Sequence, residues 1–350
     1  EDYNWLGGYD YNPTPGSLII EGYRIDFNNK PLRIDNNVDV KFGIEGNNAS
    51  ISDKNGNLLF YTNGCAVMDR NLNLMPNGDS INAGKWFDQF RKYCSIGYPG
   101  FQNALILSDP GYEYGYYIFH KPNIYYPQIA DSLQLQYSYV DMQLNNGFGD
   151  VTFKNIRYVQ NQNILSSYFT SIRHKNKKDW WIIQPLEEDS IFLTFLLDGT
   201  GINRLANQNT HQYFDRFRSS ASGTAKFSPD GTKYAVYNYY DQLHVYDFDR
   251  ETGVLTNHKK VEIYPQSEID RVEIKIGSVE WSPNSRFVYC ASQEKLHQVD
   301  TWENNLQDGV TLIDTFNGTL DPFPTIIFLM AQGPDCRIYI TPKCGCNSIH

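Results

Sequence analysis

The stretch SGTAKFSPDGTKYAVYNYYDQLHVYDFDRETGVLTNHKKVEI, residues 222 to 263, decides the fold. It contains four runs typical of β-strands, at 224 to 228, 232 to 239, 242 to 248 and 254 to 262. The breaks between these runs are SPDG, a Tyr-Asp-Gln corner and DRETG, in which Asp and Gly accept the backbone angles that a hairpin demands. Four consecutive antiparallel strands predict one blade of a β-propeller.

The same succession of polar turn and aromatic strand occurs six times along the chain. The turns are SDKNG (52–56), GYEYG (111–115), HKNK (174–177), FSPDG (227–231), WSPNS (281–285) and QGPDC (332–336). Successive turns end 51 to 62 residues apart, and a period of this size indicates a propeller or an array. We therefore predict one domain, 1–350, with blade units near 48–102, 103–166, 167–220, 221–276, 277–323 and 324–350.

Composition supports an all-β fold. Aromatic residues make up 15% of the chain, led by 26 Tyr, and these types prefer pleated, half-buried surfaces. No long stretch keeps a helical spacing of apolar residues, so we expect very little helix. The last unit lacks a fourth strand, so we predict that residues 1–47 close the ring, with 16–27 pairing to the last unit. The sequence is compatible with either six or seven four-stranded blades in the ring.

Charge and hydropathy exclude two classes of partner. The net charge is −10 with no stripe of Lys and Arg, whereas a nucleic-acid partner requires a basic face. The longest apolar run near the end, 326–331, is far short of the roughly 20 residues of a membrane-spanning helix, so no membrane insertion is expected. The chain begins at Glu1 and has six cysteines, which leads us to expect a secreted protein after removal of its signal peptide.

No motif in the sequence predicts a catalytic residue, a cofactor or a metal site. Carboxylates lie close together at Glu187, Glu188 and Asp189, and again at Asp247 and Asp249. A glycosidase needs two carboxylates flanking one bond, but Asp247 and Asp249 also suit a hairpin turn. The histidines contain no HExxH or HxH pair, so a ligand set would need different blades to meet in space; they are His120, His174, His211, His244, His258, His297 and His350.

Aromatic residues offer a further alternative, since a sugar can stack on them. The candidates are Trp180 and Trp181 together with Tyr237, Tyr239 and Tyr240. Neighbouring residues of a strand point to opposite faces, so we expect one Trp of the pair to lie in the core.

The repeated motifs resemble those of large extracellular proteins of Bacteroidota, notably Saprospiraceae-like bacteria. In these proteins a β-propeller region precedes a C-terminal sorting domain for type IX secretion. The matching segments cover nearly the whole chain: NASISDKNGNLLFYTNG (48–64), RHKNKKDWWII (173–183), FSPDGTKYAVYNY (227–239), VYDFDRETG (245–253), WSPNSRFVYC (281–290) and LDPFPT (320–325). The resemblance implies export by the type IX machinery to the outer cell surface or the medium. It implies no established chemistry.

Two kinds of covalent modification follow from this resemblance. Cys336 departs from the turn chemistry of related repeats, and with Cys344 and Cys346 close behind it a local disulfide is expected; Cys65 and Cys94 are expected to pair near the corners of the first unit. Three Asp-Ser-aliphatic triplets match an O-glycosylation acceptor of exported Bacteroidota proteins, at Ser80, Ser132 and Ser190.

The sequence thus favours a secreted or surface-displayed propeller that serves as a binding, adhesion or structural assembly module without catalysis. Its expected partners are a protein or glycan at the cell surface, a second copy of the chain, and the secretion machinery during export. The alternative is an extracellular hydrolase or lyase acting on polysaccharide, with its site at the mouth of the central channel. Convergence of three or more His, Asp or Glu residues would favour that alternative.

Overall fold

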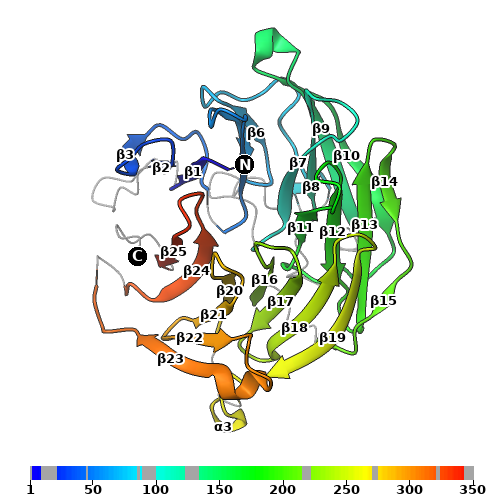
Figure 1. Ribbon diagram of the computed structural model, residues 1–350. Coiled ribbons are helices and arrows are strands. Elements are labelled where there is room, and N and C mark those ends of the chain that lie inside the picture. Colours follow the sequence, from blue (N-terminus) through cyan, green and yellow to red (C-terminus); the bar gives the residue numbers. More distant parts are fainter. Residues whose placement is uncertain are drawn as a thin grey trace. The chain divides into compact units, whose positions relative to one another are not determined.

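The computed structural model describes residues 2–8, 22–44, 46–84, 87–88, 100–122, 134–214, 222–269, 275–320 and 324–342. The chain divides into two compact units, Glu1–Ile164 and Leu165–His350. Both are built from antiparallel β-sheets joined by turns and loops (Figure 1).

The described part of the first unit contains three sheets, and the first strands of successive sheets contact each other, β1 with β4 and β4 with β7. One sheet is β1 (Asn4–Gly7), β2 (Gly22–Asp26) and β3 (Arg33–Val38). The next is β4 (Ala49–Ser52), β5 (Leu58–Thr62) and β6 (Val67–Asp69). The third is β7 (Ala104–Ser108), β8 (Gly115–His120), β9 (Gln134–Asp141) and β10 (Asp150–Gln160).

The described part of the second unit contains four sheets whose first strands again contact in order, β11 with β16, β16 with β20 and β20 with β24. The first is β11 (Thr170–Arg173), β12 (Trp180–Pro185), β13 (Ile191–Asp198) and β14 (Gly201–Arg204), with β15 (Gln208–Asn209) also paired to β13. The second is β16 (Gly223–Phe227), β17 (Lys233–Asn238), β18 (Gln242–Asp249) and β19 (Val254–Val261). The third is β20 (Ser278–Trp281), β21 (Phe287–Ser292), β22 (Lys295–Asp300) and β23 (Val310–Thr315), and the fourth is β24 (Ile327–Gln332) and β25 (Ile338–Pro342).

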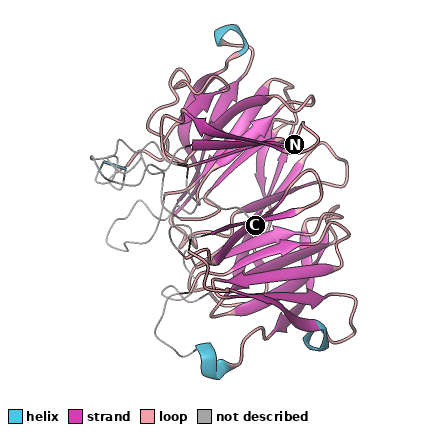
Figure 2. Cartoon of the chain, turned by 90° about the vertical axis from the view of Figure 1, so that its left-hand side faces the viewer, coloured by secondary structure: helices cyan, strands magenta, loops and turns pink. Residues whose placement is uncertain are grey.

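Helix is scarce in the described residues, as Figure 2 shows. It includes the short α-helix α3 (Gln266–Ile269), the two 3₁₀ turns η3 (Asn145–Gly147) and η4 (Leu306–Gly309), and the helical residues 87–88. Among the described residues, no helix has the length and hydropathy to cross a membrane. Four-stranded antiparallel meanders that stack through their first strands are the blades of a β-propeller, so the predicted all-β fold with very little helix is confirmed.

The deciding stretch forms the sheet β16–β17–β18–β19, and its strands lie within one or two residues of the predicted bounds. The first hairpin closes through its turn side chains, since the Ser228 hydroxyl accepts from the amide of Lys233 (2.9 Å) and Asp230 accepts from the amide of Thr232 (2.9 Å). Gly231 has a φ of +71°, which a residue without a Cβ adopts at little cost. The SPDG turn therefore sets the register of the hairpin.

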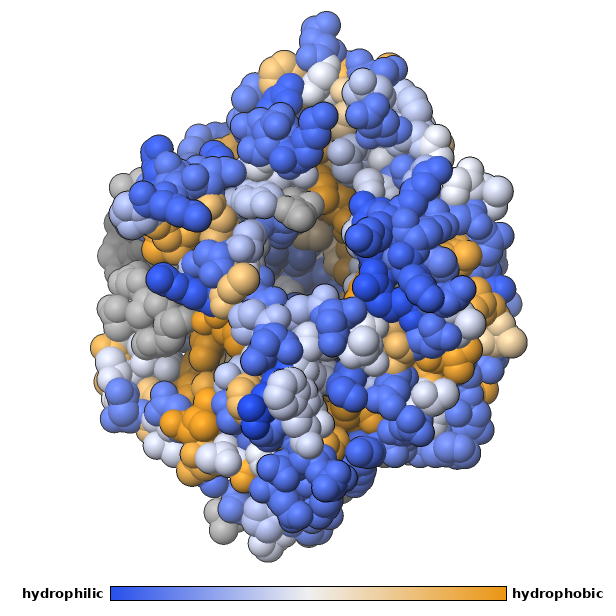
Figure 3. All heavy atoms as spheres, in the orientation of Figure 1, coloured by the Kyte–Doolittle hydropathy of each residue, from blue (hydrophilic) through white to orange (hydrophobic). Residues whose placement is uncertain are grey.

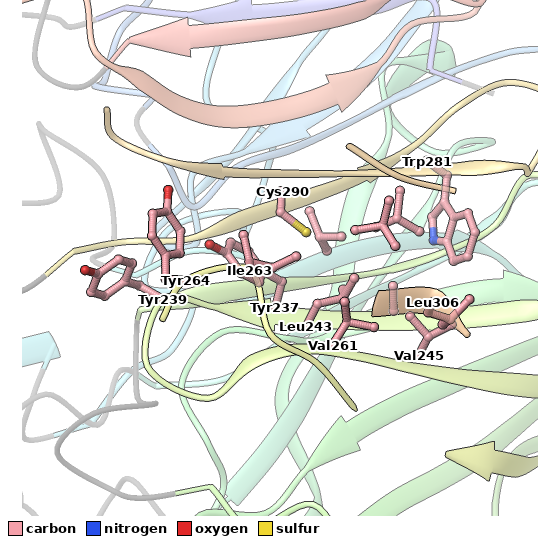
Figure 4. Close-up of a cluster of buried hydrophobic side chains, with 14 of the residues drawn as sticks. Tyr237, Tyr239, Leu243, Val245, Val261, Ile263, Tyr264, Trp281, Cys290 and Leu306 are labelled. Atoms are coloured by element: carbon pink, nitrogen blue, oxygen red, sulfur yellow. The ribbon is translucent and has the colours of Figure 1, made fainter. Parts of the chain in front are cut away.

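The core of the second unit lies between stacked sheets (Figure 4). Trp281 from β20 packs with Val245 from β18 and Val288 from β21, and all three are buried. The indole Nε1 of Trp281 donates to the carbonyl of Lys226 on β16 (3.1 Å). One side chain thus fills apolar space and ties two neighbouring sheets together.

The closing strand is where the structure departs from the sequence prediction. The described part of residues 16–27 begins at Gly22 and forms β2, which pairs with β1 and β3 in a sheet of its own. Because β2 is paired along both edges, residues 22–26 have no free edge with which to complete another sheet, and residues 16–21 lie outside the described residues. The unit that begins at residue 48 has three strands rather than four, because β6 (Val67–Asp69) is followed by turns.

Replacing the buried indole should be costly. We expect Trp281→Ala to lower the free energy of unfolding by about 3–5 kcal/mol, because it leaves a cavity between two sheets and removes a hydrogen bond. The control is Trp302→Ala, since Trp302 is 68% exposed and should cost less than about 1 kcal/mol. Urea unfolding of both variants measures the difference. Equal losses would contradict the assigned core.

Candidate functional site

The carboxylates and aromatics singled out in the sequence serve the scaffold. Asp247 accepts from Lys233 (2.9 Å) and Asn257 (2.6 Å), and Asp249 caps the β18–β19 turn by accepting from the Glu251 amide (2.8 Å). The hairpin interpretation is therefore confirmed for Asp249, whereas Asp247 lies within β18 and bonds side chains of the two neighbouring strands. In the described parts of the chain, no three His, Cys, Asp or Glu side chains are arranged to hold a metal ion.

The Trp pair divides as expected. Trp181 is 3% exposed and donates its indole N–H to the carbonyl of Arg250 (2.8 Å). Trp180 lies on the other face, with the guanidinium of Arg173 3.6 Å from its ring centre. Tyr237 and Tyr239 are buried in the core of the second unit. These side chains are not available as a sugar platform.

A buried polar relay lies in the first unit, around His120 at the end of β8. The Nδ1 atom of His120 lies 2.7 Å from Asn82 Oδ1, and its Nε2 atom lies 2.9 Å from Ser138 Oγ. Because the amide nitrogen of Asn82 donates to the carbonyl of Gly64 (3.0 Å), its oxygen faces His120. The proton therefore sits on Nδ1, and Ser138 donates its hydroxyl proton to Nε2.

This relay has the connectivity of nucleophile, base and orienting group. Ser138 and His120 have no exposed surface, however, and Ser138 Oγ also accepts from the amide of Asn155 (3.1 Å). Burial lowers the pKa of His120 to about 3, so its ring is neutral at physiological pH. Because no substrate atom can reach Ser138, the role of these three side chains is structural. Their hydrogen bonds join β8, β9 and the segment around Asn82.

The most exposed tryptophan of the described residues follows β22 in the second unit. Trp302 is 68% exposed, and the guanidinium of Arg286 lies 4.6 Å from its ring centre. Arg286 is itself fixed, because its Nε lies 3.0 Å from both carboxylate oxygens of Asp300. The amide of Trp302 donates to Asp300 Oδ1 (3.0 Å). An indole that projects into solvent is thus held in place by a cation above its face and by its own backbone.

The Arg286–Asp300 pair is electrostatically well matched. Its hydrogen bonds raise the pKa of Arg286 and lower the pKa of Asp300, so both groups stay charged at neutral pH. A fork of two guanidinium N–H groups on one carboxylate restricts both side chains more than a single contact does. Arg286, which contacts the face of the Trp302 ring, is therefore already fixed before a partner binds.

The adjoining strand β23 is apolar and open to solvent. It is the last strand of its sheet, five of its six residues are exposed, and Leu312 and Ile313 are 48% and 44% exposed. Hydrophobic surface lies over this region of β22 and β23 in Figure 3. Three exposed acidic residues occur in the same segment, namely Glu303, Asp308 and Asp314. We call Trp302, Leu312, Ile313 and these three acidic residues the β23 surface.

Sequence reasoning missed the β23 surface. The WSPNS turn and the strand after it predicted a blade. They do not predict whether Trp302 is exposed, because its exposure depends on the path of the turn between β22 and β23. The signal that could have found it is Leu312 beside Ile313, since adjacent apolar residues in an outer strand cannot both face the core.

The modification candidates are placed only in part. Ser80 and Ser190 lie partly exposed in turns, and Ser132 lies outside the described residues. Cys336 has an exposed free thiol in the β24–β25 turn, so its predicted disulfide is wrong. Hydrogen bonds close this turn instead, since the amide of Cys336 donates to the carbonyl of Gly333 (3.0 Å) and the amide of Arg337 to Asp335 Oδ1 (3.2 Å). Cys94, Cys344 and Cys346 lie outside the described residues, and the pairing of Cys65 with Cys94 stays a prediction.

Comparison with known proteins gives the fold only. No family model and no curated protein matches the chain. Among solved structures, hydrazine synthase of Kuenenia stuttgartiensis matches with a TM-score of 0.52 at 12% identity, over 94% of this chain and 88% of that one. A β-propeller domain from Myceliophteria thermophila matches with a TM-score of 0.45 at 9% identity, over 93% of this chain and 87% of that one.

A periplasmic gluconolactonase of Pseudomonas aeruginosa is also among the matches, with a TM-score of 0.41 at 16% identity, over 89% of this chain and 94% of that one. This finding corrects one expectation. The sequence predicted a module without catalysis because it lacks a catalytic motif, but enzymes occur among the structures that this chain resembles. Lack of a motif therefore does not exclude catalysis for a chain of this kind.

Buried neutral His120 should make stability depend on pH. The folded pKa of about 3 lies below the unfolded value of about 6.5, so the stabilising effect is complete above pH 6.5 and is lost as the pH falls towards 3. Between pH 7.5 and 5.0 one such histidine should account for about 2 kcal/mol of lost stability. In urea unfolding, His120→Gln should reduce this loss, and His174→Gln, which replaces an only partly buried side chain, should not. An unchanged pH dependence in His120→Gln would contradict the assigned burial.

Proposed function

We propose that this chain is a secreted or surface-displayed β-propeller that binds a partner protein through the β23 surface. In this proposal the sheets act as six or seven blades of one closed ring, and the outer strand of one blade carries the contact. The motif resemblance to exported Bacteroidota proteins supports display outside the cell by the type IX machinery. Binding at this surface is compatible with turnover elsewhere in the chain.

The observation that carries the proposal is the fixed, exposed indole of Trp302. Trp and Arg dominate the binding energy of protein interfaces because they offer large contact areas. A side chain already held in its bound position loses little conformational entropy on association. Trp302 meets both conditions, since it is 68% exposed and Arg286 is held beneath it by Asp300.

The charge of the surface indicates the chemistry of the partner. Glu303, Asp308 and Asp314 are exposed around the apolar residues, so a complementary segment would combine apolar side chains with Lys or Arg. A second copy of the chain is disfavoured, because each copy has a net charge of −10 and would bring acidic groups together. We therefore expect an extended basic and apolar segment of another protein.

Selection from a random peptide display library tests this function. Peptides enriched on the intact chain should carry apolar residues interleaved with Lys or Arg, and their binding should weaken as salt rises. We expect Trp302→Ala to raise the Kd of such peptides by about 30-fold or more, the effect of losing one hot-spot residue. Replacing Glu303, Asp308 and Asp314 by their amides should lower the rate of association.

The matched control is Leu74→Ala, because Leu74 is 52% exposed and lies in the first unit. It should leave peptide binding unchanged. Enriched peptides that bind Trp302→Ala as well as the unaltered chain would overturn the proposal. So would a library that yields acidic peptides or only self-association of the chain.

A further inference from the structure

Two histidines of neighbouring strands face each other in the second unit. His244 lies in β18 and His258 in β19, and the distance from His244 Nδ1 to His258 Nε2 is 2.7 Å. Their ring planes are parallel to within 1°, with centroids 5.0 Å apart. His244 is 5% exposed, whereas His258 is only partly buried, on the outer strand of the sheet. Two imidazole nitrogens thus converge at a point that solvent can approach.

The proton positions leave a lone pair between the two rings. His244 Nε2 lies 2.9 Å from the carbonyl oxygen of Asp241, which can only accept, so the ring carries its proton on Nε2. Nδ1 of His244 is then an acceptor that points at His258. A ligating histidine in metalloproteins usually donates its other N–H to a carbonyl or carboxylate, which fixes the tautomer and the ring orientation. His244 already has this arrangement.

One proton occupies the position between the two rings. Because Nδ1 of His244 accepts, Nε2 of His258 donates this proton. A metal ion takes the place of the proton, which moves to Nδ1 of His258 or to solvent.

The backbone around His258 is irregular at this point. The β18–β19 ladder passes from Val245 opposite Lys259 to Asp247 opposite Thr256, so two residues of β19, Asn257 and His258, lie opposite Tyr246 alone. Asn257 has a φ of +50°. A β-bulge of this kind bends its strand and re-aims a side chain, and such bulges occur next to functional sites.

Further side chains hold the arrangement from one side. The ring of Tyr246 stacks on His258, with centroids 4.8 Å apart, and its hydroxyl donates to Gln212 Oε1 (2.8 Å). Gln212 is 2% exposed, and its amide nitrogen has no partner in the described part of the chain.

We propose that His244 Nδ1 and His258 Nε2 are two ligands of a binding site for a divalent transition-metal ion of the Zn²⁺ or Cu²⁺ type. Tetrahedral bonds of about 2.0–2.1 Å require nitrogens about 3.3 Å apart, so the rings need to separate by about 0.6 Å. His258 is only partly buried and lies on the outer strand of its sheet, so its ring is the one that shifts. Water completes the coordination, and nitrogen donors select this class of ion over Mg²⁺ or Ca²⁺.

The site was not visible in the sequence, because His244 and His258 are 14 residues apart and match no metal-binding spacing. Only the pairing of β18 with β19 brings them together. It differs from the β23 surface in its elements and in its chemistry, so either proposal can fail without the other.

Titration of the full chain with ZnCl₂ after removal of metal by a chelator tests the site. Calorimetry should give one bound ion per chain, and MgCl₂ at the same concentration should give none. The variants are made in a Cys336→Ser background, because an exposed thiol also binds Zn²⁺. His258→Gln and His244→Gln should each weaken this binding by more than about 100-fold, since even loss of an outer partner costs 10- to 100-fold.

His174→Gln is the matched control, because His174 is another partly buried histidine of the second unit, and its Nε2 lies 3.1 Å from the carbonyl of Glu251. It should bind Zn²⁺ as the parent does. With Cu²⁺, the paramagnetic resonance spectrum of the parent should show coupling to two nitrogens, and His258→Gln should lose one. One-to-one Zn²⁺ binding that survives His258→Gln, or no binding in a parent with native circular dichroism, overturns the proposal.

Discussion

The structure depends on the burial of both faces of each sheet against neighbouring sheets. A four-stranded sheet is too thin to exclude water from its side chains by itself, and its apolar residues lie on both faces. In the second unit this need is met by neighbours: β11–β14 packs on β16–β19 around Phe192 and Tyr246, and β16–β19 packs on β20–β23 around Val279 and Trp281. The same arrangement joins β4–β6 to β7–β10 through Phe60 and Ile118 in the first unit. Stacking of sheets, rather than any one contact, therefore stabilises the fold.

The same constraint separates scaffold from surface. Inner strands such as β12, β17 and β20 are mostly buried. Polar groups at buried positions must find partners, as His120 does with Asn82 and Ser138. Outer strands are freed from this requirement. β19 and β23 are mostly exposed. β19 carries His258 of the histidine pair, and β23 carries the exposed Leu312 and Ile313. Side chains that could contact a ligand therefore lie on the mostly exposed outer strands.

Much of the scaffold could be predicted from the sequence, because its turns are local. The strands of residues 222–263 and the turn role of Asp249 depend on contacts between residues close in the chain. The burial of one residue of the Trp180–Trp181 pair follows from the alternation of side chains along a strand. The pairing of β2 could not be predicted, since an apolar alternating strand fits any open edge. The exposure of Trp302 and the meeting of His244 with His258 depend on a turn path and on a bulge, neither of which composition or periodicity records.

Hydrogen exchange measured strand by strand tests the central claim most directly. If burial between stacked sheets stabilises the fold, the amides of β16, β17, β20 and β21 exchange slowest and together, because they open only when neighbouring sheets separate. Amides of β19 and β23 that face solvent then exchange orders of magnitude faster. Protection that is as strong in β19 and β23 as in β16 and β20, or sheets that lose protection one at a time, would contradict it.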